Sequence, residues 1–122
     1  MNSPFTDFVK KIVDLPEDQE EKFRNLLSIK RIKKNENFIS AGEFPKTMAF
    51  VNQGLFRYYY TNDRGEEFTK VFFPENSLLS SYSAIVEERS SHFSIQALED
   101  AVIEVIGYQD FLKLFGEYPG WN

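Results

Sequence analysis

The chain has 122 residues, no cysteine and one histidine, His92, and its 14 basic and 19 acidic side chains give a net charge of −5. This length is that of one domain with a core of its own. The composition excludes disulfides, thiolate metal sites, cysteine nucleophiles and any single-chain site of several imidazoles, and the negative charge is unfavourable for binding a polyanion.

Two short helices are predicted at the start of the chain. Ser3 followed by Pro4 is typical of a helix start, because serine caps the first turn and proline fits the first helical position. A second start follows at Pro16, with acidic residues in the first turns, where the helix dipole favours them. The apolar residues of the first helix share one face: Phe5, Phe8, Val9 and Ile12.

From Ser28 onward, short β-type runs alternate with turn signals, which is typical of a sandwich or barrel. The turn at residues 62–65 (Asn-Asp-Arg-Gly) favours a hairpin. A final helix is predicted over residues 108–118. The pattern predicts a mainly β fold with flanking helices, a double-stranded β-helix or jelly roll. The predicted strands are 29–33, 37–40, 47–52, 55–61, 66–73, 78–84, 92–98 and 102–106.

Two basic features have structural explanations. The densest basic run is interpreted as the exposed face of an edge strand, where lysine discourages pairing, rather than as a DNA contact. In the run from Arg57 to Tyr60, Tyr58 shares a face with Tyr60, and Arg57 shares the other face with Tyr59. Such residues can stack on bases, but packing of an amphipathic strand is the better interpretation. The basic run consists of Lys30, Arg31, Lys33 and Lys34.

Catalysis has little support, and we do not expect an enzyme. The acid pairs at 66–67, 87–88 and 99–100 fall at predicted turns or strand ends, which favours a solvated surface over acid–base work. Nucleophile-elbow, phosphate-loop and dinucleotide motifs are missing from the sequence. His92 is either a surface histidine at the rim of the fold or a donor near a ligand pocket, because imidazole titrates near neutrality and pairs with anions.

Several stretches carry a family resemblance. Residues 37–43, 49–57 and 65–67 place an apolar strand with Gly and an acid, a strand ending in Gly before an apolar-x-Arg step, and a Gly-containing hairpin in that order. They resemble the cyclic-nucleotide-binding domain of the Crp–Fnr transcription regulators, and the likeness continues at 73–76 and 95–100. The physical pattern agrees, since Gly42, Gly54 and Gly65 occur where tight turns favour positive φ.

The resemblance implies one sensor domain over residues 1–122, with helices in 1–27, the jelly roll in 28–107 and a helix in 108–118. Members of the family continue into a long dimerisation helix and a winged helix-turn-helix that reads DNA. This chain stops about where the resemblance places the start of that long helix, so we expect no DNA-binding domain within these 122 residues. The resemblance therefore implies DNA binding only for a full-length protein, not for this chain alone, and a homodimer stays open.

The nucleotide cassette departs from the pattern of the family, which has Gly-Glu after a Phe-Pro turn and Arg-Ser before the next strand. Laid on this chain, the Gly-Glu positions fall on Leu79 and Ser80, and the Arg-Ser positions fall on Ser91 and His92, with Arg89 the nearest arginine. The acid for a ribose hydroxyl and the arginine for the phosphate are thus missing. The ligand site that the resemblance implies consists of Leu79, Ser80, Ser81, Arg89, Ser90, Ser91 and His92.

We therefore expect a regulatory effector-sensing domain with a degenerate nucleotide pocket, which binds a small-molecule effector, needs no cofactor and holds cyclic AMP weakly or not at all. The alternative is a functional cyclic-nucleotide-binding domain that uses Arg89 and the nearby serines. A cupin-like enzyme and a purely structural interaction module are further alternatives. Because the chain has neither a membrane-spanning stretch nor a signal-peptide pattern, we expect a cytoplasmic protein without a membrane partner.

Overall fold

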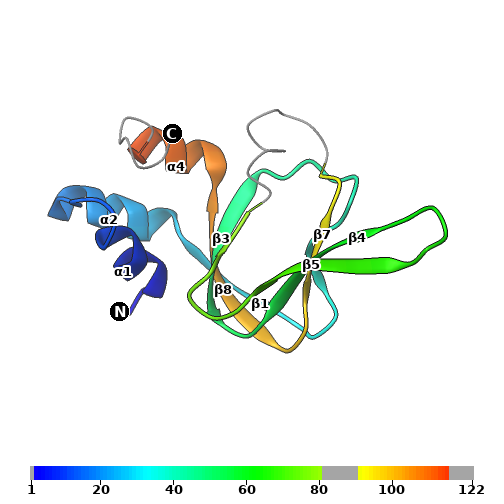
Figure 1. Cartoon of the computed structure of the whole chain (residues 1–122). Coiled ribbons are helices and arrows are strands. Elements are labelled where there is room, and N and C mark those ends of the chain that lie inside the picture. The colour runs from blue at the N-terminus through cyan, green and yellow to red at the C-terminus, as the bar shows by residue number, and fades with distance from the viewer. Residues whose placement is uncertain (1, 81–90, 116–122) are drawn as a thin grey trace.

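A computed structural model describes residues 2–80 and 91–115 of the chain. Helices α1 (Pro4–Lys10) and α2 (Glu17–Leu26) precede the strands, and α4 (Tyr108–Phe115) follows them (Figure 1). The predicted cap at Ser3 is confirmed, because its hydroxyl accepts the Thr6 N–H at 3.1 Å. Residues 116–118 of the predicted last helix lie outside the described residues. Within the described ranges, every helix is too short or too polar to cross a bilayer.

The strands form two four-stranded antiparallel sheets, with orders β1-β8-β3-β6 and β2-β7-β4-β5. The predicted mainly β fold with flanking helices is confirmed. The first sheet consists of β1 (Ser28–Ile32), β8 (Ala101–Gly107), β3 (Thr47–Gln53) and β6 (Leu78–Leu79). The second consists of β2 (Asn37–Ile39), β7 (Ser94–Ala97), β4 (Phe56–Thr61) and β5 (Glu67–Phe73).

Two predicted strands differ from the structure by more than one residue at one end. The strand predicted over 78–84 is observed as β6, and residues 81–84 lie outside the described residues. The strand predicted over 92–98 begins only at Ser94, because the Ser91 hydroxyl bonds to both the N–H and the C=O of Phe93 and closes a turn there. His92 and Phe93 therefore precede β7 and are not part of the strand.

The central strands of the first sheet, β3 and β8, are buried on both faces. In β3, Ala49 and Val51 point into the core between the two sheets, whereas Met48 and Phe50 point into a second core under the helices. Figure 1 shows the helices gathered on the β3 and β8 side, away from the second sheet. The core between the sheets also includes Ile32, Ile39, Phe56, Leu79, Ile95, Ala97, Ala101 and Ile103.

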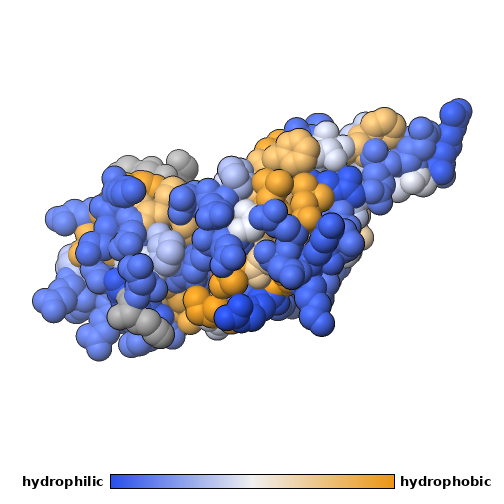
Figure 2. Space-filling view, turned by 90° about the horizontal axis from the view of Figure 1, so that it is seen from below, coloured by the Kyte–Doolittle hydropathy of each residue, from blue (hydrophilic) through white to orange (hydrophobic). Residues whose placement is uncertain are grey.

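The outer strands differ in how they meet solvent. The basic strand β1 is at one edge of the first sheet and exposes every residue except Ile32, as predicted. At the edge of the second sheet, β5 pairs with β4 in a hairpin that projects from the body (Figure 1). The exposed apolar side chains of β5 are Phe68, Val71 and Phe72. Figure 2 shows the lower face, where apolar side chains gather near the middle and polar ones cover most of the helical end.

The predicted positive φ angles of three turn glycines are confirmed. Gly42 has φ +96°, Gly54 has φ +114° and Gly65 has φ +81°. Gly54 also lies against the turn between β7 and β8, where an added Cβ atom would be 2.6 Å from the Cβ of Ala101. This close approach joins the end of β3 to the start of β8.

Candidate functional site

The structure places the first predicted site residues at the end of β6. Leu79 is 0% exposed and lies opposite Ala49 of β3, so its side chain fills the core between the sheets. The Ser80 hydroxyl is buried and has no hydrogen-bond partner among the described residues. The predicted site residues outside the described ranges are Ser81, Arg89 and Ser90.

Ser91 joins the segment before β7 to the loop between β2 and β3. Its N–H donates to the Glu43 carbonyl at 2.8 Å, and its carbonyl accepts the Gly42 N–H at 2.8 Å. The side chain is also committed locally, because the hydroxyl donates to the Phe93 carbonyl at 2.7 Å and accepts the Phe93 N–H at 3.2 Å. With 2% exposure, Ser91 is a buried anchor at the position that the resemblance gives to a phosphate-binding arginine.

An open cavity of about 300 Å³ lies beside this anchor and includes His92, the remaining predicted residue that the structure describes. Its walls come from the end of β4, the middle of β5 and the segment before β7. The lining residues are Tyr60, Thr61, Lys70, His92 and Phe93. Of these described lining residues, only His92 belongs to the predicted ligand site; Tyr60, Thr61, Lys70 and Phe93 were not predicted.

Aromatic rings form one wall of this cavity. Phe93 stacks on Tyr58 with ring centroids 4.6 Å apart, and Tyr60 meets the same ring edge-on at 6.0 Å. Tyr60 in turn stacks on Phe68 of β5 at 5.1 Å. The two tyrosines therefore share one face of β4, as predicted, and the packing interpretation is confirmed for their rings. The prediction missed that the same packing builds the wall of a cavity.

A β-bulge places a cation at the cavity. Tyr58 of β4 pairs with Val71, and Tyr59 pairs with Thr69, so Lys70 is the extra residue on β5. Bulges redirect side chains in this way. The Lys70 ammonium lies 5.4 Å from the centre of the Phe93 ring, within the range of a cation–π contact. Among the described residues, the lining includes an ammonium and an imidazole but no carboxylate.

Arg57 lies on the opposite face of β4 and is not available to this cavity. Its guanidinium donates to Gln96 of β7 at 2.8 Å and to Thr69 of β5 at 3.1 Å, and it forms an ion pair with Glu67. The same group lies 4.0 Å above the ring centre of Tyr59. Arg57 thus ties β7, β4 and β5 together, which confirms its predicted structural role.

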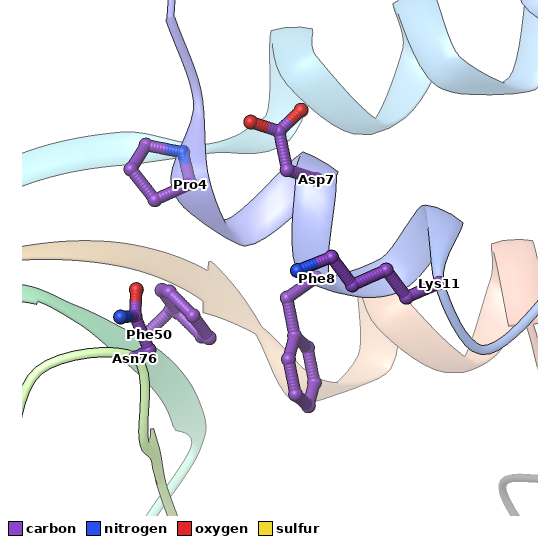
Figure 3. Close-up of a pocket in the computed structure, with 6 residues that line it drawn as sticks. All are labelled: Pro4, Asp7, Phe8, Lys11, Phe50 and Asn76. Carbon is purple, nitrogen blue, oxygen red and sulfur yellow. The ribbon is translucent and has the colours of Figure 1, made fainter.

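A second cavity, of about 220 Å³, lies on the helical side of the first sheet. Figure 3 shows that its side chains come from α1, β3 and the turn before β6, with the Asp7 carboxylate directed away from Phe50 and Asn76. None of the described residues of the predicted ligand site, which are Leu79, Ser80, Ser91 and His92, lines it. The lining residues are Pro4, Asp7, Phe8, Lys11, Phe50 and Asn76.

Comparison with solved structures gives similar folds at low sequence identity. The catabolite activator protein of Thermus thermophilus is 18% identical with a TM-score of 0.74, over 97% of this chain and 52% of that one. The sensor domain of the transcriptional regulator DNR from Pseudomonas aeruginosa is 11% identical with a TM-score of 0.77, over 94% of this chain and 81% of that one. The regulatory subunit of a cAMP-independent protein kinase A from Trypanosoma cruzi, bound to guanosine, is 13% identical with a TM-score of 0.76, over 92% of this chain and 38% of that one.

This chain thus spans about half the length of the Thermus protein. No curated protein sequence matches it significantly. The sequence profile of the cyclic nucleotide-binding domain matches residues 29–118, from the first strand to beyond α4. The predicted resemblance to the Crp–Fnr sensor domains is confirmed, and the chain belongs to the cyclic nucleotide-binding domain family.

Proposed function

We propose that this domain is a regulatory sensor of a small effector and that its nucleotide pocket is degenerate, so that cyclic AMP binds weakly or not at all. The observation that carries the proposal is the state of Ser91. At Ser91, the position that the resemblance gives to the phosphate-binding arginine, the chain has a neutral, buried side chain whose hydroxyl is already bonded to the Phe93 backbone. A phosphate charge removed from water is costly unless a cation or several donors meet it.

The size of the expected effect follows from the two missing contacts, the arginine at Ser91 and the acid at Ser80. A hydrogen bond to a charged group contributes about 1.5–3 kcal/mol, so losing two costs roughly 3–6 kcal/mol. At about 1.4 kcal/mol per tenfold change, the affinity falls by some two to four orders of magnitude.

The described cavity supports an effector of a different chemistry. Lys70 supplies positive charge, Lys70 and His92 supply hydrogen-bond donors, and the rings of Phe93 and Tyr60 supply a flat apolar surface. A small planar anion matches these features, because its charge is attracted to the Lys70 ammonium while its ring stacks on the aromatic wall. The Trypanosoma cruzi protein, described as cAMP-independent and bound to guanosine, supports a ligand other than a cyclic nucleotide in this fold.

The output of the sensor is proposed to be the position of α4. This helix begins at Tyr108, directly after Gly107 ends β8, so a shift of the strand moves the helix with it. An effector that binds one arrangement better than the other shifts their populations. DNA binding belongs, in this proposal, to a longer protein that contains this domain and not to these residues alone.

Isothermal titration calorimetry with cyclic AMP and cyclic GMP tests the proposal. We expect no measurable heat up to millimolar nucleotide. The alternative, a functional nucleotide site built on Arg89, predicts a low-micromolar dissociation constant that is lost in Arg89→Ala. The matched control is Arg64→Ala in the hairpin turn, which removes an arginine from an exposed position. Tight binding that survives Arg64→Ala and disappears in Arg89→Ala would overturn the degenerate pocket.

A further inference from the structure

We infer that Glu104 is a positioning residue that fixes α1 to β8 and, through a chain of contacting phenylalanines, sets the position of α4. Glu104 is on β8, in the middle of an otherwise apolar strand, and is 2% exposed. Glu104 is not among the residues that line either cavity, and it is not one of the predicted site residues. The inference uses the proposed function only in treating α4 as the output of the sensor.

Both oxygens of the Glu104 carboxylate are used by residues at the start of the chain. Oε2 accepts the hydroxyl of Ser3 at 2.6 Å, and Oε1 accepts the backbone N–H of Phe5 at 2.9 Å. These partners are 101 and 99 residues away in the sequence. A buried carboxylate is tolerated where donors meet it in this way, so the pairing depends on α1 lying against the sheet.

The carboxylate completes the capping of α1. Ser3 is the N-cap and accepts the Thr6 N–H, whereas the Phe5 N–H is satisfied from β8 by Glu104. Two of the N–H groups that a helix start leaves open are thus bonded by different parts of the chain. The positive end of the helix dipole also favours the nearby negative charge. Because α1 has only seven residues, it is too short to be stable alone, and its place depends on such tertiary contacts.

Aromatic contacts continue from α1 to α4. Phe5 meets Phe23 of α2 edge-on, with ring centroids 5.1 Å apart, and Phe23 meets Phe115 of α4 in the same way at 5.3 Å. All three rings are buried. Close-packed rings resist independent movement, so a displacement of α1 changes the packing surface of α4. Glu104 therefore reaches α4 by two routes, through this chain of rings and directly along β8.

Hydrogen–deuterium exchange with peptide-level mass spectrometry tests the inference on the whole chain. Glu104→Gln keeps the shape of the side chain and removes its charge, and Ser3→Ala is a milder change that removes one partner. We expect exchange to accelerate about tenfold or more in peptides covering both α1 and α4, since a charged hydrogen bond is lost. Exchange in β4 and β7 of the second sheet should stay unchanged.

The matched control is Glu36→Gln, in which an exposed carboxylate that accepts the Lys33 N–H at 2.7 Å loses its charge. This control should leave both helices unchanged. Faster exchange in α1 with α4 unaffected, or a uniform acceleration over the whole chain in Ser3→Ala, would overturn the inference. No nucleotide or effector enters the experiment, so its result is independent of the calorimetric test of the pocket.

Discussion

Among the glycines that the structure describes, Gly54 is the one at which a methyl group should damage the fold most. In Gly54→Ala, the new Cβ atom would lie 2.6 Å from the Cβ of Ala101, 3.0 Å from its Cα and 3.2 Å from the carbonyl oxygen of Asp100. Two of these neighbours are backbone atoms, which cannot rotate away. The turn must also keep φ at +114°, a conformation that L-residues rarely adopt.

The two effects give a rough magnitude. Left-handed backbone costs a residue with a Cβ atom about 1–2 kcal/mol, and inserting a methyl group into a tightly packed place costs about 1–3 kcal/mol more. We therefore expect Gly54→Ala to lose roughly 2–5 kcal/mol of unfolding free energy. Gly65→Ala is the matched control, since Gly65 has φ +81° but no atom within 4 Å of a built Cβ. It should lose only the backbone part, about 1–2 kcal/mol.

Urea unfolding followed by far-ultraviolet circular dichroism measures both changes, with the slope of the transition expected to stay constant. A second variant, Gly54→Ala combined with Ala101→Gly, removes the nearest contact and leaves the two backbone contacts. It should recover part of the loss. Equal destabilisation by Gly54→Ala and Gly65→Ala would refute the argument from close approach and leave only backbone strain.

Three further outcomes are expected. Phe23→Ala should lose about 3–5 kcal/mol in the same urea assay, because a buried ring that joins α1 to α4 is removed; a loss below about 1 kcal/mol would contradict the aromatic core. The hydrogen bond from Lys10 lowers the pKa of Glu20 below its ordinary value of 4.5, with a smaller contribution from Arg24. Glu20 therefore stabilises the fold above pH 4.5, and its advantage over Glu20→Gln in urea unfolding should shrink as the pH falls below that value; an advantage that grows in acid would contradict this. Fluorescence anisotropy should show no sequence-dependent binding of duplex DNA by this chain, because its net charge is −5; submicromolar specific binding would show the reverse.

Local sequence chemistry predicted most of the elements of this fold. The capping serine, the hairpin turn and the positive-φ glycines are choices that a few neighbouring residues decide, and the structure confirms them at Ser3, at Gly42, Gly54 and Gly65. The ends of strands are harder to predict where a side chain forms hydrogen bonds with backbone groups that would otherwise pair with a neighbouring strand. At Ser91 the hydroxyl bonds to Phe93 and delays the start of β7 by two residues relative to the predicted position 92.

The arrangement around the cavity depends on tertiary structure. Lys70 is an ordinary strand residue in the sequence, and only the bulge opposite Tyr58 and Tyr59 turns it toward Phe93. The burial of Glu104 also depends on tertiary structure, because an acid in an apolar run of the sequence suggests a solvent-facing position. It is buried because the helices cover the outer face of the first sheet and bring Ser3 to it from 101 residues away.

The projecting hairpin offers a place for a reporter. Its turn, at the tip of the hairpin (Figure 1), is closed by its own hydrogen bonds, with the Asn62 side chain accepting the N–H groups of Arg64 and Glu66. Among the described residues, no atom lies within 4 Å of a Cβ built on Gly65. Exposed turns of this kind tolerate inserted residues and chemical labels. The two strands lead from this turn to Tyr60 and Lys70 at the cavity. We therefore expect that a fluorophore attached at position 64, through a cysteine that the chain otherwise lacks, would report entry of the proposed effector without altering the core.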